Sequence, residues 1–406
     1  MLDDFKPATE TDLARIVTDA AAKGTSLNIM GAGSKQALGR RMETDKRLSM
    51  RALSGIVLYE PTEMVMSARA GTRLIDIEAQ LAGRGQMLAF EPSDYASLTG
   101  GQPGLSTIGG VFATNTSGPR RVTAGAARDH FIGVRAVTGR GELIKSGGRV
   151  MKNVTGVDVC RGLANSWGTL AVVSEVTFKV LPMPESTATI ILFGLPDEFA
   201  VEAMCAAMMT PFEVSAAAHI QSSLATALQH AGLRSQGRSV TALRIENVPK
   251  SIEYRKDRLV EALKSFGDIH QLDRDNSVSF WGEVRTLGVF HGGSAPVWRI
   301  STAPRNGPKV VAAITKYMDC KAIYDWSGGL VWAEVLATSD AGAADIRRVV
   351  ATYGGHATLM RASPDVRAAV EVFQPLDVGA AKLTRKLKAT FDPSGVLNPG
   401  RMYADL

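Results

Sequence analysis

The sequence predicts an α+β protein of two domains, and three observations support that prediction. At 406 residues the chain is too long for one ordinary hydrophobic core. Strand-like and helix-like hydrophobic patterns alternate along it without an internal repeat. Two prolines at 182 and 184 interrupt the pattern. We therefore expect a first domain over residues 1–184, a second α/β-sandwich-like domain over 185–385, and a C-terminal segment, 386–406, that returns to the first domain.

The predicted first domain begins with an amphipathic helix over residues 9–23. Thr9 caps this helix and Gly24 ends it. A short strand over 27–30 leads directly into a glycine-rich loop. Further strands are expected over 55–59, 64–70, 132–137, 143–145 and 170–181, with a helix over 74–82. Residues 99–125 have little regular period and are rich in Gly, Thr, Ser and Pro, which predicts a long functional loop.

The second half continues with a strand over 188–193 and helices over 197–209 and 254–266. Residues 382–388 have basic residues spaced like the solvated face of a helix. Residues 391–401 contain two prolines and two glycines, so they cannot extend a helix and predict a shaped, docked terminus.

Composition excludes several classes of protein. The formal charge is +6, but no Lys/Arg run is interleaved with aromatic residues, so a nucleic-acid surface is not expected. The three cysteines are far apart, which excludes an iron–sulfur cluster or zinc ribbon within the chain. The start lacks a signal-peptide pattern, and no apolar run approaches the ~18 residues of a membrane span. We expect a cytoplasmic protein, peripheral to the inner face of the membrane at most through a partner.

The first glycine loop suits a diphosphate. Consecutive backbone N–H groups around Gly31 and Gly33 can point into one concavity, while Ser34 adds a hydroxyl donor and Lys35 a positive charge. A nicotinamide-binding dinucleotide fold is the weaker interpretation, because a helix precedes the strand and too few apolar residues follow the glycines. For this loop alone, a turn without a ligand remains the simpler alternative.

The second glycine loop favours a ligand-binding role over a turn without a ligand. Residues 107–118 contain the pair Gly109-Gly110, further small residues and several side-chain donors. Such a segment can approach a flat ring and a diphosphate together, because nothing bulky blocks it.

These loops and several other segments, taken in order, resemble the p-cresol methylhydroxylase/vanillyl-alcohol oxidase family of FAD enzymes. The matching segments are the loops at 31–34 and 107–118, with 69–72, 128–133, 168–177 and 392–401. Within that family the sequence of these segments most resembles that of FAD-binding subunits of glycolate oxidase. The resemblance implies a two-subdomain FAD-binding domain of that type, followed by a second α/β-sandwich domain that covers the substrate.

The resemblance also implies which residues hold FAD. The pyrophosphate would lie against Gly31, Ala32, Gly33, Ser34, Lys35, Thr107, Ile108, Gly109, Gly110, Ala113, Thr114 and Asn115. Ser117 and Gly118 would lie near the ring edge, the backbone of Val172 and Val173 near the adenine, and Asn398 and Arg401 would return to the flavin domain.

The chain also departs from its relatives. Many of them attach the flavin covalently through a histidine in the first glycine loop, where this chain has Ser34 and Lys35, so we expect non-covalent FAD. His130 and Cys160 are interpreted as structural. The His-Pro-Gly-Asp-Gly-Asn motif of relatives that oxidise 2-hydroxy acids by themselves is missing, and the six histidines form no pair at metal-ligand spacing, so no metal site is predicted.

Arg299 is the best candidate for holding a substrate carboxylate. A guanidinium binds a carboxylate through two parallel hydrogen bonds, and the neighbouring Trp298 is expected to provide a dry wall. An arginine pointing outward from an edge strand is an equally good interpretation. Arg69, His130 and Lys152 are weaker candidates.

Taken together, the sequence predicts an FAD-dependent oxidoreductase that transfers a hydride from a small 2-hydroxy acid to the flavin. By resemblance, electrons would pass to a complex containing a sister FAD subunit and an iron–sulfur subunit. Three alternatives stay open: a flavin subunit that relays electrons or has a structural role without turnover, a free-standing oxidase of sugar lactones or alcohols, and a binding module without redox chemistry.

Overall fold

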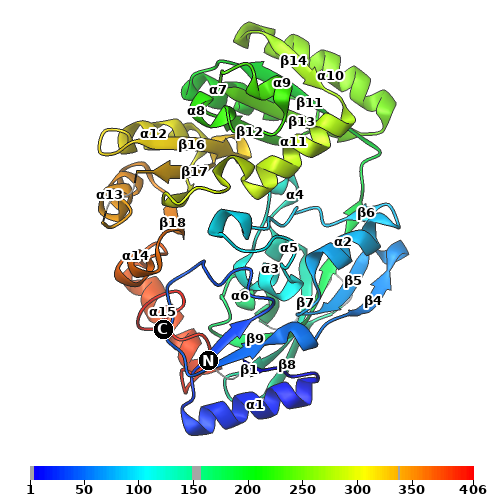
Figure 1. Cartoon of the computed structure of the whole chain (residues 1–406). Helices are drawn as coiled ribbons and strands as arrows, with labels where there is room; N and C mark the ends of the chain where they lie inside the picture. The colour runs from blue at the N-terminus through cyan, green and yellow to red at the C-terminus, as the bar shows by residue number, and fades with distance from the viewer. Residues whose placement is uncertain (1–3, 149–156, 337–338) are drawn as a thin grey trace.

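The chain folds into two halves, each built around its own β-sheet (Figure 1). The computed structural model describes residues 4–148, 157–336 and 339–406. Within those residues, no helix is both long and apolar enough to cross a membrane. The protein is α+β, as the sequence predicts. The division at residue 184 stays a prediction, and the larger sheet begins just after it, at Ser186.

The N-terminal half contains a five-stranded antiparallel sheet and a small parallel one. The five strands lie in the order β4 (Ile56–Glu60), β5 (Val65–Arg69), β9 (Ala171–Lys179), β7 (Phe131–Thr138), β8 (Leu143–Gly147). The small sheet has the order β1 (Asp4–Phe5), β3 (Lys46–Ser49), β2 (Leu27–Met30). The helices of this half are α1 (Glu10–Lys23), α2 (Leu74–Ala82), α3 (Ile108–Thr114), α4 (Arg121–Ala124), α5 (Ala127–His130) and α6 (Val159–Leu163).

Helix α1 shows why the local predictions succeed. The Thr9 hydroxyl accepts a hydrogen bond from the backbone N–H of Asp12 at 3.0 Å, and Gly24 ends the helix with φ of 64°. Leu13 and Val17 are fully buried against the small sheet and the ends of β7 and β9. Capping and a 3.6-residue apolar period are local properties, so the sequence alone reveals them.

The C-terminal half is an eight-stranded antiparallel sheet. Its order is β14 (Ile269–Leu272), β11 (Ser186–Phe193), β13 (Val240–Asn247), β12 (Val214–Ile220), β16 (Cys320–Asp325), β17 (Leu330–Val335), β15 (Val297–Ser301), β18 (His356–Arg361). Helices α7 (Asp197–Met208), α10 (Pro249–Leu263), α12 (Gly307–Ile314) and α13 (Ala343–Tyr353) pack on one face, and α11 (Arg274–Thr286) packs against β11. Short helices α8 (Ser222–Ala225), α9 (Ala231–Arg234) and α14 (Pro364–Ala369) complete this half.

A buried network of four charged side chains joins the two halves. Arg244 on β13 binds both carboxylate oxygens of Glu91, each at 2.9 Å. Arg120 contacts Glu91 as well and pairs with Glu246. Burial alone would raise the pKa of Glu91, but Arg244 and Arg120 lower it to about 2. The network therefore fixes how the second half sits on the first.

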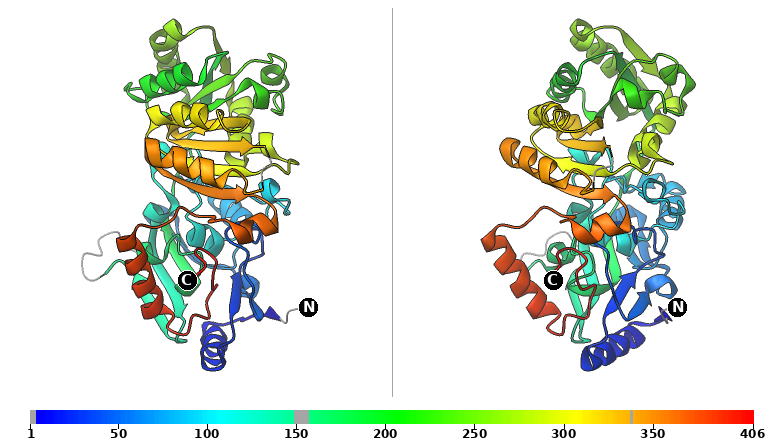
Figure 2. Two further views of the ribbon diagram at one scale, coloured as in Figure 1. Left: turned by 90° about the vertical axis from the view of Figure 1, so that its left-hand side faces the viewer. Right: turned by 60° about the vertical axis from the view of Figure 1, so that its left-hand side comes forward.

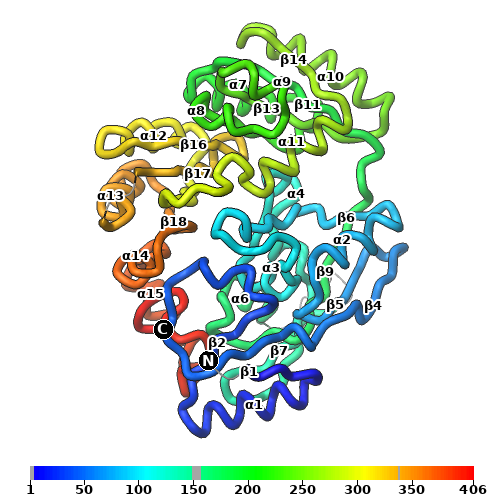
Figure 3. The backbone as a smooth tube through the Cα atoms, in the orientation of Figure 1, coloured from blue at the N-terminus to red at the C-terminus, as the bar shows by residue number. Residues whose placement is uncertain are grey.

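The C-terminal segment lies against the N-terminal half (Figures 2 and 3). Helix α15 (Val378–Phe391) precedes it, and Leu397 forms a parallel bridge with Leu27 of β2. The prediction that Lys388 lies on a solvated face is wrong. Its ammonium is buried and donates to the carbonyls of Thr169 and Leu397 and to the Asp392 carboxylate, at 2.7–2.8 Å. Three acceptors replace the water that the charge loses.

The predicted long loop at 99–125 needs a correction. It contains α3 and α4, which are too short for a helical period to stand out in a glycine-rich sequence. Thr107 caps α3 through its hydroxyl, which accepts from the Gly110 N–H, and Asn115 ends it in the left-handed region with φ of 49°. Elsewhere the predicted strands and helices occur within a few residues of their expected limits, with β6 (Gln86–Met87) and β10 (Leu181–Pro182) forming an additional two-stranded sheet.

Candidate functional site

The two glycine loops face a shared cavity. Gly33 of the first loop and Gly110 of the second both line it, together with Lys35 and Arg401. An adjoining narrow cavity is lined by Gly31, Gly109 and Gly110 and extends toward Val173. The two loops, more than seventy residues apart in sequence, therefore form opposite sides of one slot.

Glycine is required at positions 31 and 109, where the backbone lies too close to a neighbouring residue for a side chain. A Cβ on Gly31 would lie 2.3 Å from the Thr107 hydroxyl oxygen, and one on Gly109 would lie 2.7 Å from the Cβ of Ala70. A Cβ on Gly110 would lie 3.6 Å from the Lys35 ammonium and would fill the space beside it. The slot is thus open because these positions have no side chain.

Lys35 places a positive charge in this slot. Its Nζ donates to the Ser106 hydroxyl at 2.6 Å. Burial lowers the pKa of Lys35 to about 8, and Asp94 offsets the effect only in part. An ammonium that contacts no carboxylate of residues 4–148, 157–336 and 339–406, next to bare backbone, is suited to a phosphate oxygen.

The C-terminal segment closes the slot. The Asn398 side-chain amide accepts from the Ile29 N–H and donates to the Trp167 carbonyl, both at 2.7 Å. Arg401 donates to the Lys35 carbonyl at 2.7 Å, and its guanidinium lies 5.8 Å from the centroid of the Trp167 ring. Asn398 and Arg401 line the cavity that Gly33 and Gly110 share.

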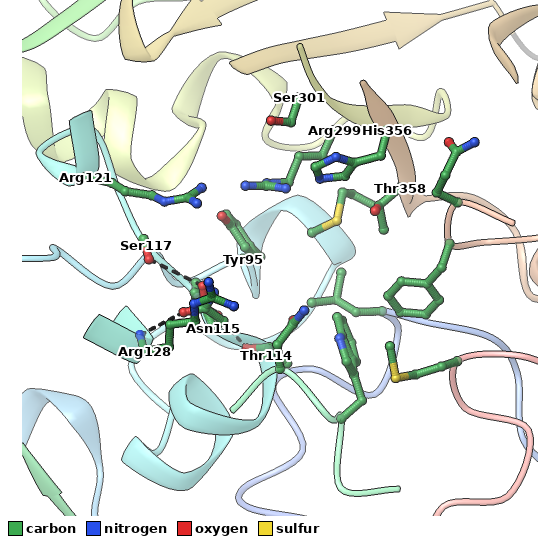
Figure 4. Close-up of a pocket in the computed structure, with 18 of the residues that line it drawn as sticks. Tyr95, Thr114, Asn115, Ser117, Arg121, Arg128, Arg299, Ser301, His356 and Thr358 are labelled. Carbon is green, nitrogen blue, oxygen red and sulfur yellow. Dashed lines mark hydrogen bonds between the residues drawn. The ribbon is translucent and has the colours of Figure 1, made fainter. Parts of the chain in front are cut away.

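A larger cavity of about 360 Å³ adjoins the slot, because Thr114 and Trp167 line both. It lies between the halves, under strands β15 and β18 (Figure 4). Arg299 and His356 enter it from these strands, and Tyr95 and Arg121 enter from the N-terminal half. Asn115 and Ser117 line this cavity too.

Arg299 is not on an edge strand, because β15 pairs with β17 on one side and with β18 on the other. The prediction that Trp298 forms a dry wall beside Arg299 is wrong. Side chains alternate along a strand, so Trp298 points to the other face and donates to the Ala341 carbonyl. The aromatic walls are Trp326 and Trp332, whose ring centroids lie 5.2 and 6.0 Å from the Arg299 guanidinium.

Electrostatics distinguishes the cationic groups of this cavity. Burial lowers the pKa of Arg299 and of Arg121. The positive charge of Arg299 lowers the pKa of Arg121 further. Burial and the nearby arginines also lower the pKa of His356, so its imidazole is neutral at pH 7. Arg128 lines the cavity as well, so the cavity offers three guanidiniums for an anion and one neutral imidazole that can accept a proton.

The other predicted residues are divided between the core and the slot. The side chains of Ile108 and Val172 are fully buried in the core. Gly118 lies outside the cavities described above, and a Cβ on it would lie 2.4 Å from the Glu91 carbonyl oxygen. Ala32 and Ser34 line the slot shared by the glycine loops, and Ala113 lines both parts of the slot.

The weaker candidates do not join the site either. Arg69 lines a separate groove on the five-stranded sheet. His130 is buried and contacts the Ala124 carbonyl at 2.8 Å, and burial lowers its pKa, in agreement with a structural role. Cys160 is buried, as expected, and burial raises its pKa to about 12. Lys152 lies outside the described residues.

Sequence reasoning missed Tyr95, Arg121 and His356. Arg121 follows the second glycine loop within a few residues, and this proximity was the one available signal. His356 occupies a strand without a motif, and Tyr95 stands in an irregular segment. Among the described residues, no group of three or more His, Cys, Asp or Glu side chains could hold a metal ion.

Comparisons with known proteins agree with this arrangement. Residues 4–147 match the family model described as an FAD binding domain. The chain is 32% identical to the glycolate oxidase subunit GlcE of Escherichia coli K12, over 96% of each protein. It is 22% identical to the glycolate oxidase subunit GlcD of Bacillus subtilis 168, over 98% of this chain and 88% of that one.

A solved structure of p-cresol methylhydroxylase with substrate bound superposes with a TM-score of 0.74. The match covers 99% of this chain and 88% of that one, at 12% sequence identity. At such low identity the likeness shows the fold, and it agrees with the p-cresol methylhydroxylase-type architecture expected from the sequence.

Proposed function

The chain belongs to the family of the glycolate oxidase subunit GlcE and has the p-cresol methylhydroxylase-type FAD-binding fold; from that premise we propose that it is the FAD-binding subunit of a complex that oxidises a small 2-hydroxy acid. One observation carries the proposal. A glycine-lined slot that contains the desolvated ammonium of Lys35 adjoins a cavity with three guanidiniums and a neutral imidazole.

The slot fits FAD. Lys35 and the N–H groups around Gly110 would hold the pyrophosphate, with Asn398 and Arg401 closing the slot. Trp167 and Thr114 line both spaces, so the flavin ring would reach from the slot into the larger cavity. No histidine stands in the first glycine loop, which supports non-covalent binding.

The residues of the larger cavity have complementary tasks in this reaction. Arg299 would hold the substrate carboxylate, with Trp326 and Trp332 excluding water around the guanidinium. His356 would take the hydroxyl proton as the carbonyl forms. Bound FAD supplies the acceptor for the hydride that leaves the carbinol carbon.

Electrons would then leave through partners. The three cysteines are free and far apart in sequence, so this chain has no cysteine set for a cluster. We infer a sister FAD subunit and an iron–sulfur subunit as partners, and a location in the cytoplasm, at the membrane only through such a partner. The subunit naming of the two glycolate oxidase relatives supports an assembly of several chains.

A second candidate is a flavin subunit that relays electrons without turning over substrate. The missing His-Pro-Gly-Asp-Gly-Asn motif favours it. The two roles differ in their response to Arg299→Met in the assembled complex. An oxidising subunit would lose about tenfold or more in kcat/KM for glycolate, whereas a relay subunit would be unaffected.

The test of the proposal begins with the purified full chain. We expect a yellow protein whose pigment stays in the supernatant after acid precipitation. In the assembled complex, anaerobic addition of a 2-hydroxy acid should bleach this flavin. A colourless protein would refute FAD binding, and a yellow pellet would refute non-covalent binding alone.

A further inference from the structure

The larger cavity has more positive charge than a monocarboxylate needs. Arg121, Arg128 and Arg299 line it, and none of the described lining residues is an aspartate or glutamate. Arg128 has an ion-pair contact of 3.9 Å with Asp129, which leaves Arg121 and Arg299. Neither guanidinium has a hydrogen bond or ion pair with another described residue. The carboxylate of Asp325 acts on Arg299 and that of Asp129 on Arg121 without a direct contact, so the donors of both guanidiniums stay available to an anionic ligand.

Trp326 holds the two guanidiniums in place. The Cζ of Arg121 lies 4.2 Å from the centroid of this ring and the Cζ of Arg299 lies 5.2 Å from it. Cation–π contacts of this kind orient an arginine without neutralising its charge. Because Arg121 comes from the N-terminal half and Arg299 from β15, the ring sets the spacing between two cations from different halves.

The turn that supplies Trp326 is itself strained and anchored. Trp326, Ser327 and Gly328 all have positive φ, at 50°, 59° and 97°. The buried Asp325 carboxylate accepts from the Trp326 N–H at 2.7 Å, and the indole N–H donates to the Gly118 carbonyl at 3.1 Å. Backbone strain at a non-glycine residue persists only where surrounding contacts impose it, and it is concentrated at functional sites. Trp326 is therefore a positioning residue.

We propose that the substrate of this cavity is a 2-hydroxy dicarboxylate, with Arg299 holding one carboxylate and Arg121 the other. The inference rests on the proposed function and narrows its substrate class. Since both guanidiniums contact one ring, their Cζ atoms are less than about 10 Å apart. A four- or five-carbon diacid with a charge-assisted contact at each end is long enough to reach both guanidiniums.

The opposing assignment gives Arg121 to the flavin ring or to structure alone. In that case one carboxylate would suffice, and loss of Arg121 would affect mono- and diacids alike. The two assignments therefore differ in a ratio of affinities, which is independent of turnover.

The experiment uses the full chain with FAD bound and follows ligand binding through the flavin absorption spectrum. Succinate and butyrate, which have no hydroxyl to oxidise, are the matched pair; malate and 2-hydroxybutyrate are the corresponding substrates in the assembled complex. We expect succinate to bind about tenfold or more tightly than butyrate, since a second charge-assisted contact contributes about 1.5–3 kcal/mol. The ratio should approach one in Arg121→Met, with the Kd for butyrate nearly unchanged.

Two further variants separate the explanations. Arg121→Lys keeps the charge without the bidentate geometry and should retain part of the preference. Arg348→Met removes a cation from the exposed surface of α13 and should leave the ratio unchanged. Equal Kd values for succinate and butyrate in the wild type, or equal losses for both in Arg121→Met, would overturn the inference. If succinate is preferred but no hydroxy acid bleaches the flavin, the ligand class stands and the proposed oxidation fails.

Discussion

Lys35 offers the most direct test of the slot, through the substitution Lys35→Met. Burial lowers the pKa of its ammonium from 10.5 to about 8. That change corresponds to about 3 kcal/mol of unfavourable free energy for the charged form at neutral pH. Lys35 keeps a hydrogen bond to Ser106 and is only partly buried as a residue, so the net cost in the apoprotein is smaller, about 1–2 kcal/mol.

The substitution should therefore have opposite effects on stability and on binding. At pH 7 the apoprotein of Lys35→Met should unfold at a higher temperature than wild type, because a desolvated charge has been removed. Its affinity for FAD should fall about tenfold to hundredfold, since a charge-assisted contact with phosphate contributes about 1.5–3 kcal/mol. If Lys35 had a purely structural role, its substitution would not raise the stability of the apoprotein and at the same time weaken FAD binding.

The pH dependence has a definite sign. The folded pKa lies below the unfolded value, so the unfolded chain binds more protons between about pH 8 and 10.5. The wild-type apoprotein should gain stability as pH rises through that interval. FAD affinity should fall over the same interval, because the deprotonated amine no longer attracts the phosphate.

The assay is titration of deflavinated protein with FAD, followed by flavin fluorescence at pH 7 and pH 9. Lys382→Met, which removes a lysine from the exposed surface of α15, is the control for net charge. Wild-type affinity in Lys35→Met at pH 7, or the same pH dependence in both proteins, would refute this account of the slot.

Three further predictions concern the contacts that shape the site. Glu91→Gln should remove up to about 3 kcal/mol of the unfolding free energy at pH 7, because the wild-type carboxylate has a pKa of about 2 beside Arg244. That stability is present above pH 4.5 and is lost as pH falls toward 2. Urea unfolding at several pH values measures the loss. Lys388→Met leaves the acceptors of a buried ammonium unpaired and should cost about 3–5 kcal/mol, with weaker FAD binding because the C-terminal segment loosens; thermal unfolding with and without FAD checks both, and an unchanged Tm would contradict it. Gly31→Ala should displace the Thr107 hydroxyl, with which its Cβ would clash at 2.3 Å. The resulting loss of free energy of FAD binding should exceed the loss of free energy of unfolding of the apoprotein, and equal losses would argue against a cofactor slot.

Much of the fold followed from local sequence patterns. Helix α1 was predicted with its cap, its end and its buried face, and the glycine loops were predicted to meet around one cavity, which Gly33 and Gly110 do. The short helix α3 and the burial of Lys388 were not predicted. A seven-residue helix of glycine and small residues has too little amphipathic period to be recognised, and a lysine among other basic residues looks solvated until its acceptors are known.

The sequence by itself determined the two bare backbone loops, the lysine beside the first of them and the shaped terminus, because steric freedom, capping and periodicity depend on near neighbours; the resemblance to known FAD enzymes implied that they meet around one cofactor. Only the tertiary structure decided what faces the larger cavity. The alternation of β15 sends Arg299 inward and Trp298 outward, and the packing of the halves brings Arg121 to the same Trp326 ring. Side-chain direction on a strand and contact across an interface depend on partners distant in sequence, so no local pattern could have shown that two cations share one aromatic surface.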